Sequence, residues 1–315
     1  MHKQAKDFLL RRLHANWIGY FEAVRLHGSL RKAATALNVS PSAVSRALKD
    51  VEDLLGETLF ERGSAGLRLT AAGEAVAEHT RTVVRDLERL NGLLSDMRGL
   101  RRGHVAIGAV EATEALILES LDAIRAAHDG ITADCRFLSS AKVSAEVLSG
   151  ERDLGVAFNV PSVPGLRHLI DVPLPFGAVM QPAHPLAANR LLRIYDIHEA
   201  EPEIVLQDHS LATRDIVDEL ARQAGIELRP TITSSSAQFI VTLVQRGFGI
   251  GLRTPLGIER ELEAGELVFV PLVDRKLTPP MLCVITSDTR PLSRAAEAFA
   301  EALRAGAARL LARYV

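Results

Sequence analysis

The sequence feature that most limits the fold of this chain is the Ser40-Pro41 pair, because it fixes the start of a third short helix within the first seventy residues. Serine at the N-cap followed by proline at the first helical position is a strong start signal. The apolar residues that follow recur at spacings of four, three and four, which predicts one buried face, and Gly56 ends the helix. The residues of that expected core face are Val44, Leu48, Val51 and Leu55.

Two shorter helices are predicted before this one. Residues 16–27 carry one apolar stripe, and Gly28 ends their helix. Ser29 is the expected N-cap of the next helix, residues 30–37, whose inner face consists mostly of small residues that permit close helix packing. The stripe of the first helix is Trp17, Phe21 and Val24, and the inner face of the second is Ala33, Ala34 and Leu37.

The outer face of the third helix combines short hydroxyl side chains with cations. Short side chains allow a helix to approach the major groove of DNA closely, arginine reads guanine with two hydrogen bonds, and lysine neutralises phosphate. This pattern predicts a helix-turn-helix that binds duplex DNA. The expected DNA-binding residues of the helices are Ser29, Arg31, Ser40, Pro41, Ser42, Ser45, Arg46 and Lys49.

The segment ETLFERGSAGLRLT predicts two short strands around a glycine-containing turn, with Arg62 and Arg68 on either side of it. A basic hairpin next to a recognition helix is typical of a wing that reaches the DNA backbone or minor groove. Residues 1–70 contain 11 Lys and Arg against 7 Asp and Glu, while the whole chain has a net charge of −2. The alternative is a three-helix module whose basic residues only solvate a surface, but the joint occurrence of these signals favours DNA binding.

The same stretch resembles the N-terminal domain of LysR-type transcriptional regulators. The matching elements are Gly28-Ser29, Ala33-Ala34, Leu37, Val39-Ser40, Ser45-Arg46, Leu54-Leu55-Gly56, Leu59-Phe60-Glu61-Arg62, and Leu69-Thr70 followed by Gly73. By its match, Arg46 resembles the DNA-contacting arginine of the family. The family usually has Gln-Pro after the serine of the third helix, where this chain has Pro41-Ser42, so operator preference does not carry over from typical members.

A long helix is predicted over residues 71–100, where no proline occurs. Apolar residues in an almost unbroken heptad pattern predict a dimer seam formed by Val76, Val83, Leu87, Leu90 and Leu94, with Thr80 as a polar member of the pattern. The alternative is an amphipathic helix that packs on its own domain. The family resemblance implies dimerisation through this helix and usually a tetramer. A two-fold dimer predicts inverted half-sites about 34 Å apart, or a multiple of that distance.

Beyond Arg101-Arg102-Gly103, predicted strands and helices alternate in two series, which indicates α/β sheets with helices on both faces. One predicted helix, residues 113–128, is expected to turn Leu118, Leu121 and Ile124 inward. The resemblance implies a type II periplasmic-binding-protein-like effector domain with two lobes. The expected fold is thus a winged helix-turn-helix domain over residues 14–70, a linker helix over 71–100 and an effector domain over 103–315. Lobe I comprises about 103–175 and 277–315, and lobe II about 176–276.

Ligands of open α/β sheets bind at the carboxyl ends of the strands, against helix N-termini. Hydroxyl groups gather at these junctions, namely Thr113, Ser139, Ser140, Thr213, Ser234, Ser235 and Ser236, and Asn159, His209 and Arg253 add polar groups. Hydroxyls and free backbone N–H groups at helix N-termini favour an anionic effector such as a carboxylate. The alternative is that each hydroxyl only caps a helix.

Other chemistries find little support in the sequence. Gly247, Gly249 and Gly251 precede a strand instead of a helix, Ser139 and Lys142 lack companion motifs of serine enzymes, and His198-Glu199 has no second histidine. We therefore expect no catalytic residues, no cofactor and no metal. No apolar run is long enough to span a membrane, the basic N-terminus lacks the apolar segment of a signal peptide, and the two cysteines suit a reducing cytosol.

The sequence predicts a regulator in the bacterial cytoplasm, associated with the nucleoid, whose partners are double-stranded DNA, a small-molecule effector and further copies of the chain. RNA polymerase is an additional candidate partner. Two alternatives remain open: a DNA-binding protein that needs no effector, and an enzyme on the α/β lobes with a DNA-binding appendage.

Overall fold

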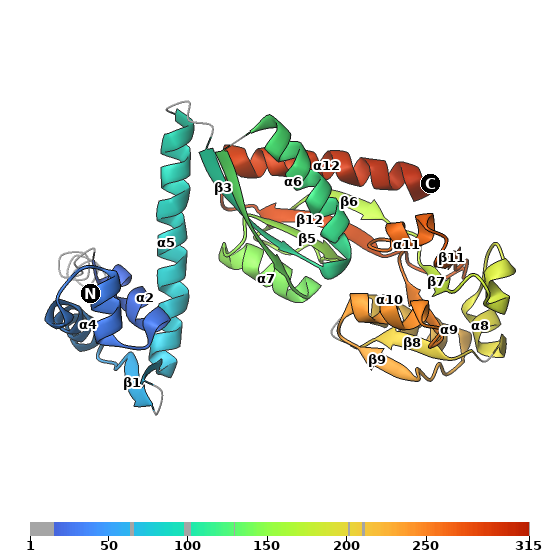
Figure 1. Ribbon diagram of the computed structural model, residues 1–315, viewed down its shortest axis with the longest axis horizontal. Coiled ribbons are helices and arrows are strands. Elements are labelled where there is room, and N and C mark those ends of the chain that lie inside the picture. The colour runs from blue at the N-terminus through green and yellow to red at the C-terminus, as the bar shows by residue number, and fades with distance from the viewer. Residues whose placement is uncertain are drawn as a thin grey trace. The chain divides into compact units, whose positions relative to one another are not determined.

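Three short helices open the part of the chain that the computed structural model describes, which comprises residues 16–63, 66–97, 102–128, 130–200, 202–209 and 212–314. They are α2 (Trp17–His27), α3 (Leu30–Ala36) and α4 (Pro41–Leu55). A hairpin of β1 (Phe60–Gly63) and β2 (Gly66–Leu69) and the long helix α5 (Ala71–Met97) follow (Figure 1). The chain divides into two compact units, Met1–Glu88 and Arg89–Val315.

The helix ends of the first unit lie where the sequence predicts them. Gly28 and Gly56 follow α2 and α4 with φ of 61° and 73°, the left-handed conformation that glycine adopts without strain. Ser40 caps α4, because its Oγ accepts a hydrogen bond from the backbone N–H of Ala43 at 3.2 Å. Ser29 occupies the N-cap position of α3 but makes no capping hydrogen bond with its side chain.

The core of the first unit contains the predicted apolar faces with two exceptions. Leu37 and Leu55 were expected inside, but 38% and 45% of their surface is exposed. Both lie at the C-terminal end of a helix, at the turn into the next segment of the same unit. The buried core consists of Phe21, Ala23, Val24, Ala33, Ala34, Val44, Leu48, Val51, Leu59 and Ala77.

The first turns of α5 pack on this same core. Thr80 is fully buried and its Oγ1 donates to Glu22 Oε1 at 2.8 Å, and Val76 packs half-buried against the cluster. The start of the helix is thus taken up by its own unit, and Val76, predicted for the seam, packs on that unit's core instead. Leu87 and Leu90 are 56% and 50% exposed, whereas the side chain of Leu94 lies outside the described residues.

Gly73, in the first turn of α5, gives a stability prediction. A methyl group at this position would collide with the backbone carbonyl oxygen of Leu59. We expect Gly73→Ala to lower the free energy of unfolding of the first unit by about 1–3 kcal/mol, the usual cost of overpacking. The fluorescence of Trp17, the single tryptophan, reports the urea midpoint of this unit. Gly19→Ala is the control, because no atom lies within 4 Å of its added methyl group. An unchanged midpoint for Gly73→Ala would contradict the packing of α5 on Leu59, the residue before β1.

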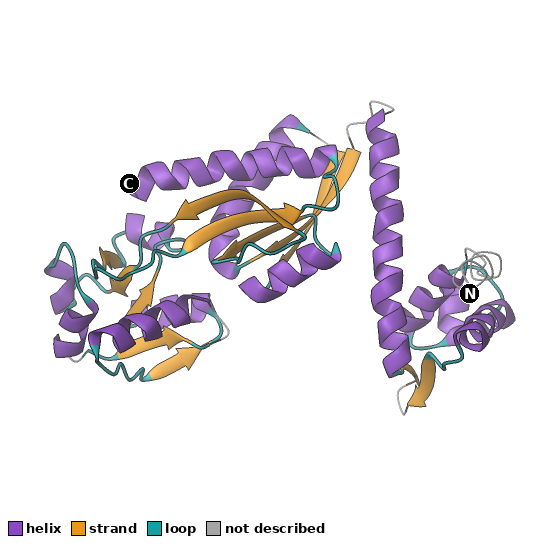
Figure 2. Cartoon of the chain, turned by 180° about the vertical axis from the view of Figure 1, so that it is seen from behind, coloured by secondary structure: helices purple, strands orange, loops and turns teal. Residues whose placement is uncertain are grey.

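The second unit contains two five-stranded sheets (Figure 2). The first has the order β4-β3-β5-β12-β6, and together with its helices we call it the first lobe. Its helices α6 and α12 cover one face of the sheet and α7 covers the other (Figure 1). The elements are β3 (Arg102–Ala109), the 3-10 turn η1 (Glu111–Thr113), α6 (Glu114–Ala127), β4 (Gly130–Phe137), α7 (Ser140–Ser149), β5 (Leu154–Phe158), β6 (Leu166–Pro173), β12 (Met281–Ser287) and α12 (Arg294–Tyr314).

The second sheet has the order β11-β7-β10-β8-β9 and forms the second lobe with its helices. Strands β8, β9 and β10 run parallel to one another, and β7 pairs antiparallel with both β10 and β11. The predicted fold class is confirmed, although the sequence analysis missed β6 and α8. The elements are β7 (Gly177–Met180), η2 (Pro185–Ala188), α8 (Ile194–Ala200), β8 (Ile204–Gln207), α9 (Ala212–Ala224), β9 (Ile232–Ser234), α10 (Ala237–Gln245), β10 (Ile250–Arg253), α11 (Glu259–Glu263) and β11 (Val268–Pro271).

The predicted inner face of α6 is partly wrong. Leu118 is 57% exposed, whereas Ile124 is buried and Leu121 packs half-buried against the core, as predicted. The helix also buries Leu116, Ile117 and Ser120. A helix turns by about 100° per residue, so six residues place Leu118 about 120° away from Ile124 around the axis. Leu118 therefore faces away from the sheet when Ile124 faces it.

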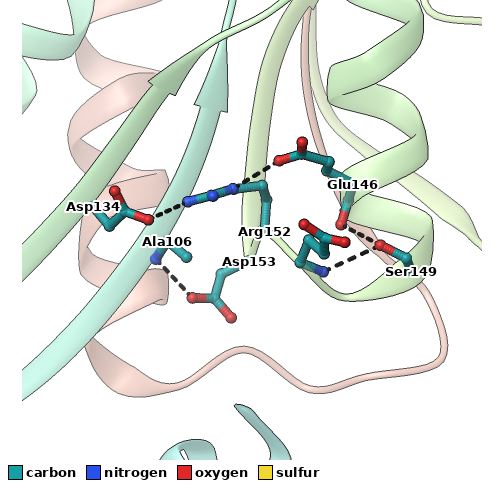
Figure 3. A network of polar contacts seen from close by, with 7 residues as sticks. Ala106, Asp134, Glu146, Ser149, Arg152 and Asp153 are labelled. Carbon is teal, nitrogen blue, oxygen red and sulfur yellow. Dashed lines mark hydrogen bonds and ion pairs between the residues drawn. The ribbon is translucent and has the colours of Figure 1, made fainter. Parts of the chain in front are cut away.

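A buried ion-pair network holds the turn from α7 into β5 (Figure 3). Arg152 is 4% exposed, and its guanidinium donates to Glu146 Oε2 at 3.0 Å and to Asp134 Oδ2 at 2.6 Å. The hydrogen bond from Arg152 holds the pKa of Asp134 below its ordinary value. Asp153 Oδ2 accepts from the backbone N–H of Ala106 on β3 at 2.9 Å. These contacts tie α7, β3, β4 and β5 together in the first lobe.

Candidate functional site

The outer face of α4 is exposed in the part of the chain that the structure describes. Ser42, Ser45, Arg46 and Lys49 are all exposed, and their positions on the first half of the helix follow from the cap at Ser40. Among the residues that the structure describes, no acidic side chain pairs with Arg46 or Lys49. The Oγ atoms of Ser40 and Ser42 lie 3.0 Å apart, so part of the hydrogen-bonding capacity of these two serines is used locally. Of the remaining predicted contacts, Arg31 and Pro41 are exposed and Ser29 is half-buried.

The hairpin is fixed to the helices by its backbone. The N–H of Leu67 donates to the carbonyl oxygen of Gly28 at 2.9 Å, so β2 is attached to the turn before α3. In the backbone register of the hairpin, Arg62 lies opposite Leu67 and Arg68 lies opposite Glu61. Both arginine side chains are exposed. The turn residues 64 and 65 lie outside the described part. The strands thus hold two cations at defined positions in the same unit as α4.

A pocket lies between the two lobes of the second unit. Its empty volume is about 440 Å³, including the solvent at its mouth. Three predicted effector residues, Ser140, Thr213 and Arg253, line it. The complete lining is Val110, Glu111, Ala112, Ser140, Phe158, Gln207, Thr213, Ala237, Arg253 and Thr254.

The other predicted effector residues do not line this pocket. Thr113 is fully buried and donates to the carbonyl oxygen of Val110 at 2.8 Å, and Ser139 occupies the N-cap position of α7. Asn159 Oδ1 accepts from the N–H of Met281 at 2.8 Å, which ties β5 to the start of β12.

The remaining predicted effector residues belong to the second lobe, where their side chains contact other residues of the chain or are exposed. His209 is 71% exposed at its side chain, with Nδ1 3.5 Å from Asp218 Oδ2. Ser234 Oγ accepts from the backbone N–H of Ser236 at 3.1 Å, and Ser235 is exposed. Geometry thus favours a capping or structural role for Ser234.

Arg253 supplies a buried positive charge behind the pocket. Its guanidinium donates to the carbonyl oxygens of Thr254, Ala237 and Leu256 at 3.1, 3.3 and 2.8 Å. Burial lowers the pKa of Arg253 to about 10, an effect that the charges of Glu259, Glu261 and Glu111 oppose. The side chain therefore stays cationic at neutral pH and fixes the first residue of α10.

Glu111 and Gln207 are two of the seven lining residues that the sequence did not predict. Glu111 Oε2 accepts from the backbone N–H of Ala237 at 3.0 Å. Gln207 is 3% exposed, and its Oε1 is buried without a hydrogen-bond partner. Both lie at or just after the carboxyl end of a strand, β3 for Glu111 and β8 for Gln207. The rule that ligands bind at these strand ends covers both residues, but neither carries the hydroxyl group on which the sequence prediction mainly relied.

One set of metal-capable side chains gathers elsewhere in the first lobe. Donor atoms of His168, Asp171 and Cys283 lie within 4.8 Å of one another. His168 Nδ1 and Asp171 Oδ1 are already hydrogen-bonded at 2.8 Å, and burial raises the pKa of Cys283 to about 12. A cysteine binds metal as a thiolate, so this environment opposes ligation.

Within the described ranges, no helix is long and apolar enough to cross a bilayer.

The fold and these two surfaces define a DNA-binding regulator with a ligand-binding domain. Residues 15–74 match the family model described as bacterial regulatory helix-turn-helix protein, lysR family, and residues 98–308 match the LysR substrate binding domain. The chain belongs to the LysR family of DNA-binding transcription regulators, which confirms the resemblance noted in the sequence.

Curated relatives cover nearly the whole chain. A probable RuBisCO transcriptional regulator of Cyanidium caldarium is 26% identical over 286 residues, which cover 88% of this chain and 89% of the relative. The HTH-type transcriptional regulator CbbR of Rhodospirillum rubrum is 26% identical over 294 residues, covering 93% and 97% of the two chains.

A solved structure of the same family shares the fold. Full-length CbnR complexed with its target DNA has a TM-score of 0.68 at 20% identity, and the match covers 92% of this chain and 99% of CbnR. The likeness therefore extends over the helix-turn-helix module, the long helix and both lobes.

Proposed function

We propose that the chain reads duplex DNA through α4 as a homodimer, which assembles further into a tetramer, and responds to a small anionic effector bound between its lobes. The observation that carries the DNA-binding proposal is the exposed face of α4, where Ser45, Arg46 and Lys49 stand free in the same unit as the hairpin arginines. In the bacterial cytoplasm such a protein acts on the nucleoid, and RNA polymerase is the further partner through which it would control transcription.

Arg46 and Lys49 have different proposed tasks. Arginine can donate two hydrogen bonds to the O6 and N7 atoms of guanine, which distinguishes one base pair from another. Lysine approaches phosphate as a point charge and contributes affinity without sequence preference. Arg62 and Arg68 on the hairpin would contact the backbone or the minor groove. The short side chains of Ser42 and Ser45 leave room for the helix to enter the groove.

The experiment that tests this proposal compares Arg46→Ala with Lys49→Ala. Fluorescence anisotropy is measured on a duplex that the wild-type protein has selected from a random library, and on a scrambled duplex. We expect Arg46→Ala to weaken binding to the selected duplex by about 1–3 kcal/mol and to relax specificity at one position. Lys49→Ala should weaken binding to both duplexes similarly and reduce the slope against salt by about one.

Arg304→Ala is the matched control, because Arg304 is an exposed cation on α12 that pairs with Glu301. It should leave both affinities unchanged. Wild-type affinity in both α4 variants would remove this helix from the DNA interface.

The effector proposal is supported by the composition of the pocket. Hydroxyl groups of Ser140 and Thr213 and the buried charge of Arg253 line a space with walls formed by Val110, Phe158 and other apolar residues. A carboxylate on a small organic body suits this combination. A true ligand raises the melting temperature by mass action, so a thermal-shift screen of organic acids separates this proposal from a regulator that needs no effector. The family match favours the regulator over an enzyme with a DNA-binding appendage.

A further inference from the structure

A carboxylate of the first lobe is bound to the start of a helix in the second lobe. Glu111 lies in η1, directly after β3, and its Oε2 accepts from the backbone N–H of Ala237 at 3.0 Å. Its Oε1 lies 3.5 Å from the Oγ of Ser236, the residue that caps α10. Since η1 belongs to the first lobe and α10 to the second, this side chain joins the two lobes at the pocket that it lines.

Glu111 lies at a position in the pocket where a helix N-terminus and a buried cation both favour an anion. The N-terminus of a helix carries a partial positive charge, and its N–H groups point outward from the first turn. The buried guanidinium of Arg253 donates to the carbonyl oxygen of Ala237, so a full positive charge lies next to the same residue. Glu111 is one of three carboxylates whose charges favour the protonated form of Arg253. The side chain thus supplies the negative charge that an anionic ligand would otherwise supply.

Other contacts keep the lobes together without this carboxylate. Leu256, from the segment after β10, is fully buried in the core cluster of the first lobe. Gly257, with φ of 79°, lies so close to η1 that an added methyl group would come 2.8 Å from the carbonyl oxygen of Ala112. Glu111 can therefore leave α10 while the lobes stay joined through Leu256 and Gly257.

We infer that Glu111 is a tethered occupant of the anion position at the start of α10, and that a carboxylate effector binds by displacing it. The inference rests on the proposed function of the pocket as the effector site. A site that is occupied by its own tether for most of the time shows a weaker apparent affinity, in proportion to the fraction that is free. Displacement also removes a hydrogen bond between the lobes, which couples effector binding to the contact between them.

Gln207 defines a second requirement for the ligand. Gln207 lines the same pocket, and its buried Oε1 has no partner, although buried acceptors in native proteins are nearly always hydrogen-bonded. A hydroxyl group on the ligand would donate to this oxygen. The ligand class is therefore a hydroxylated carboxylic acid with an apolar body that contacts Val110 and Phe158.

The test compares Glu111→Ala and Glu111→Gln with the wild type in the full-length protein. Isothermal titration calorimetry measures the Kd of 3-hydroxybenzoate and of its neutral analogue 3-hydroxybenzamide. We expect Glu111→Ala to bind the acid about tenfold more tightly than the wild type, as for a site that is free only about a tenth of the time. The amide has no charge to place at the anion position, so it should bind without displacing Glu111 and with the same affinity in both proteins. The affinity of Glu111→Gln for the acid should lie between those of the wild type and Glu111→Ala, because glutamine keeps a weaker acceptor at this position. Glu114→Ala is the charge-matched control, because Glu114 is exposed and does not line the pocket.

Hydrogen exchange of the Ala237 amide provides a readout that does not depend on ligand affinity. It should accelerate in Glu111→Ala and slow again when the acid binds, while the melting temperature shows that the variant is folded. Equal affinity of the acid for wild type and Glu111→Ala, or an equal gain for the amide, would overturn the displacement mechanism and leave the effector pocket intact. Absence of binding in every variant, or unchanged exchange at Ala237, would also overturn it. The regulator function itself is tested separately by Arg46→Ala on DNA.

Discussion

A chain that carries Leu87→Glu and Leu90→Glu is expected to be monomeric and to bind a selected duplex about 10²–10⁴-fold more weakly than the wild type. The two leucines are 56% and 50% exposed on α5, where burial against a second copy would remove their apolar surface from water. Glutamates at the same positions would bring four negative charges together in the dimer. The loss of affinity is large because two linked recognition helices bind one duplex far more tightly than one helix does.

Light scattering after size-exclusion chromatography gives the oligomeric state, and fluorescence anisotropy gives the affinity for DNA. Leu191→Glu is the matched control, because Leu191 is 54% exposed and belongs to the second lobe and not to α5. It should leave both properties unchanged. A double variant that stays dimeric and retains its affinity would show that the seam on α5 is not the interface.

Arg152→Met is expected to lower the free energy of unfolding of the second unit by about 3–5 kcal/mol, the usual cost of removing one partner from a buried ion pair. The guanidinium of Arg152 is the partner of Glu146, whose side chain is only 11% exposed. Methionine fills a similar space but leaves that carboxylate without its cation. Trp17 lies in the first unit, so hydrogen exchange of the β3 and β5 amides is the appropriate measurement. A loss below about 1 kcal/mol would show that the network contributes little.

The pH dependence of this variant follows from Asp134. Arg152 lowers the pKa of Asp134 below its ordinary value of 3.8, so the pair stabilises the folded state above that pH. The contribution is lost as the pH falls through the lowered pKa, since the folded carboxylate then takes up its proton. Arg152→Met lacks this contribution at every pH, and the stability gap to the wild type should therefore narrow in strong acid. Arg304→Ala breaks an exposed ion pair, so its stability should differ little from that of the wild type at every pH.

The sequence predicted the helices of the first unit well, because caps and periodicity are local signals. Ser40, Gly28 and Gly56 act at their own positions, and no distant contact changes them. Leu37 and Leu55 were misplaced because periodicity does not show where the buried face of a helix ends. Thr80 fits a heptad by spacing, yet Glu22 binds it inside the unit, and only the folded chain brings these two residues together.

The pocket was harder to predict, because only the folded chain determines which residues of the strand–helix junctions face it. Ser140, Thr213 and Arg253 line it, and each lies at a strand–helix junction that the alternating pattern reveals. Thr113 and Asn159 lie at similar junctions, but their side chains bond to the backbone of the first lobe. Glu111 was missed because a search for groups that bind an anion passes over a carboxylate.

The central claim is that α4 enters duplex DNA as one of a symmetric pair, and a hydroxyl-radical footprint of the wild-type protein on its selected duplex tests it most directly. The account predicts two protected, inverted half-sites whose centres are about 34 Å apart or a multiple of that distance, with protection lost in Arg46→Ala. A single protected half-site, or a footprint that Arg46→Ala leaves unchanged, would contradict it.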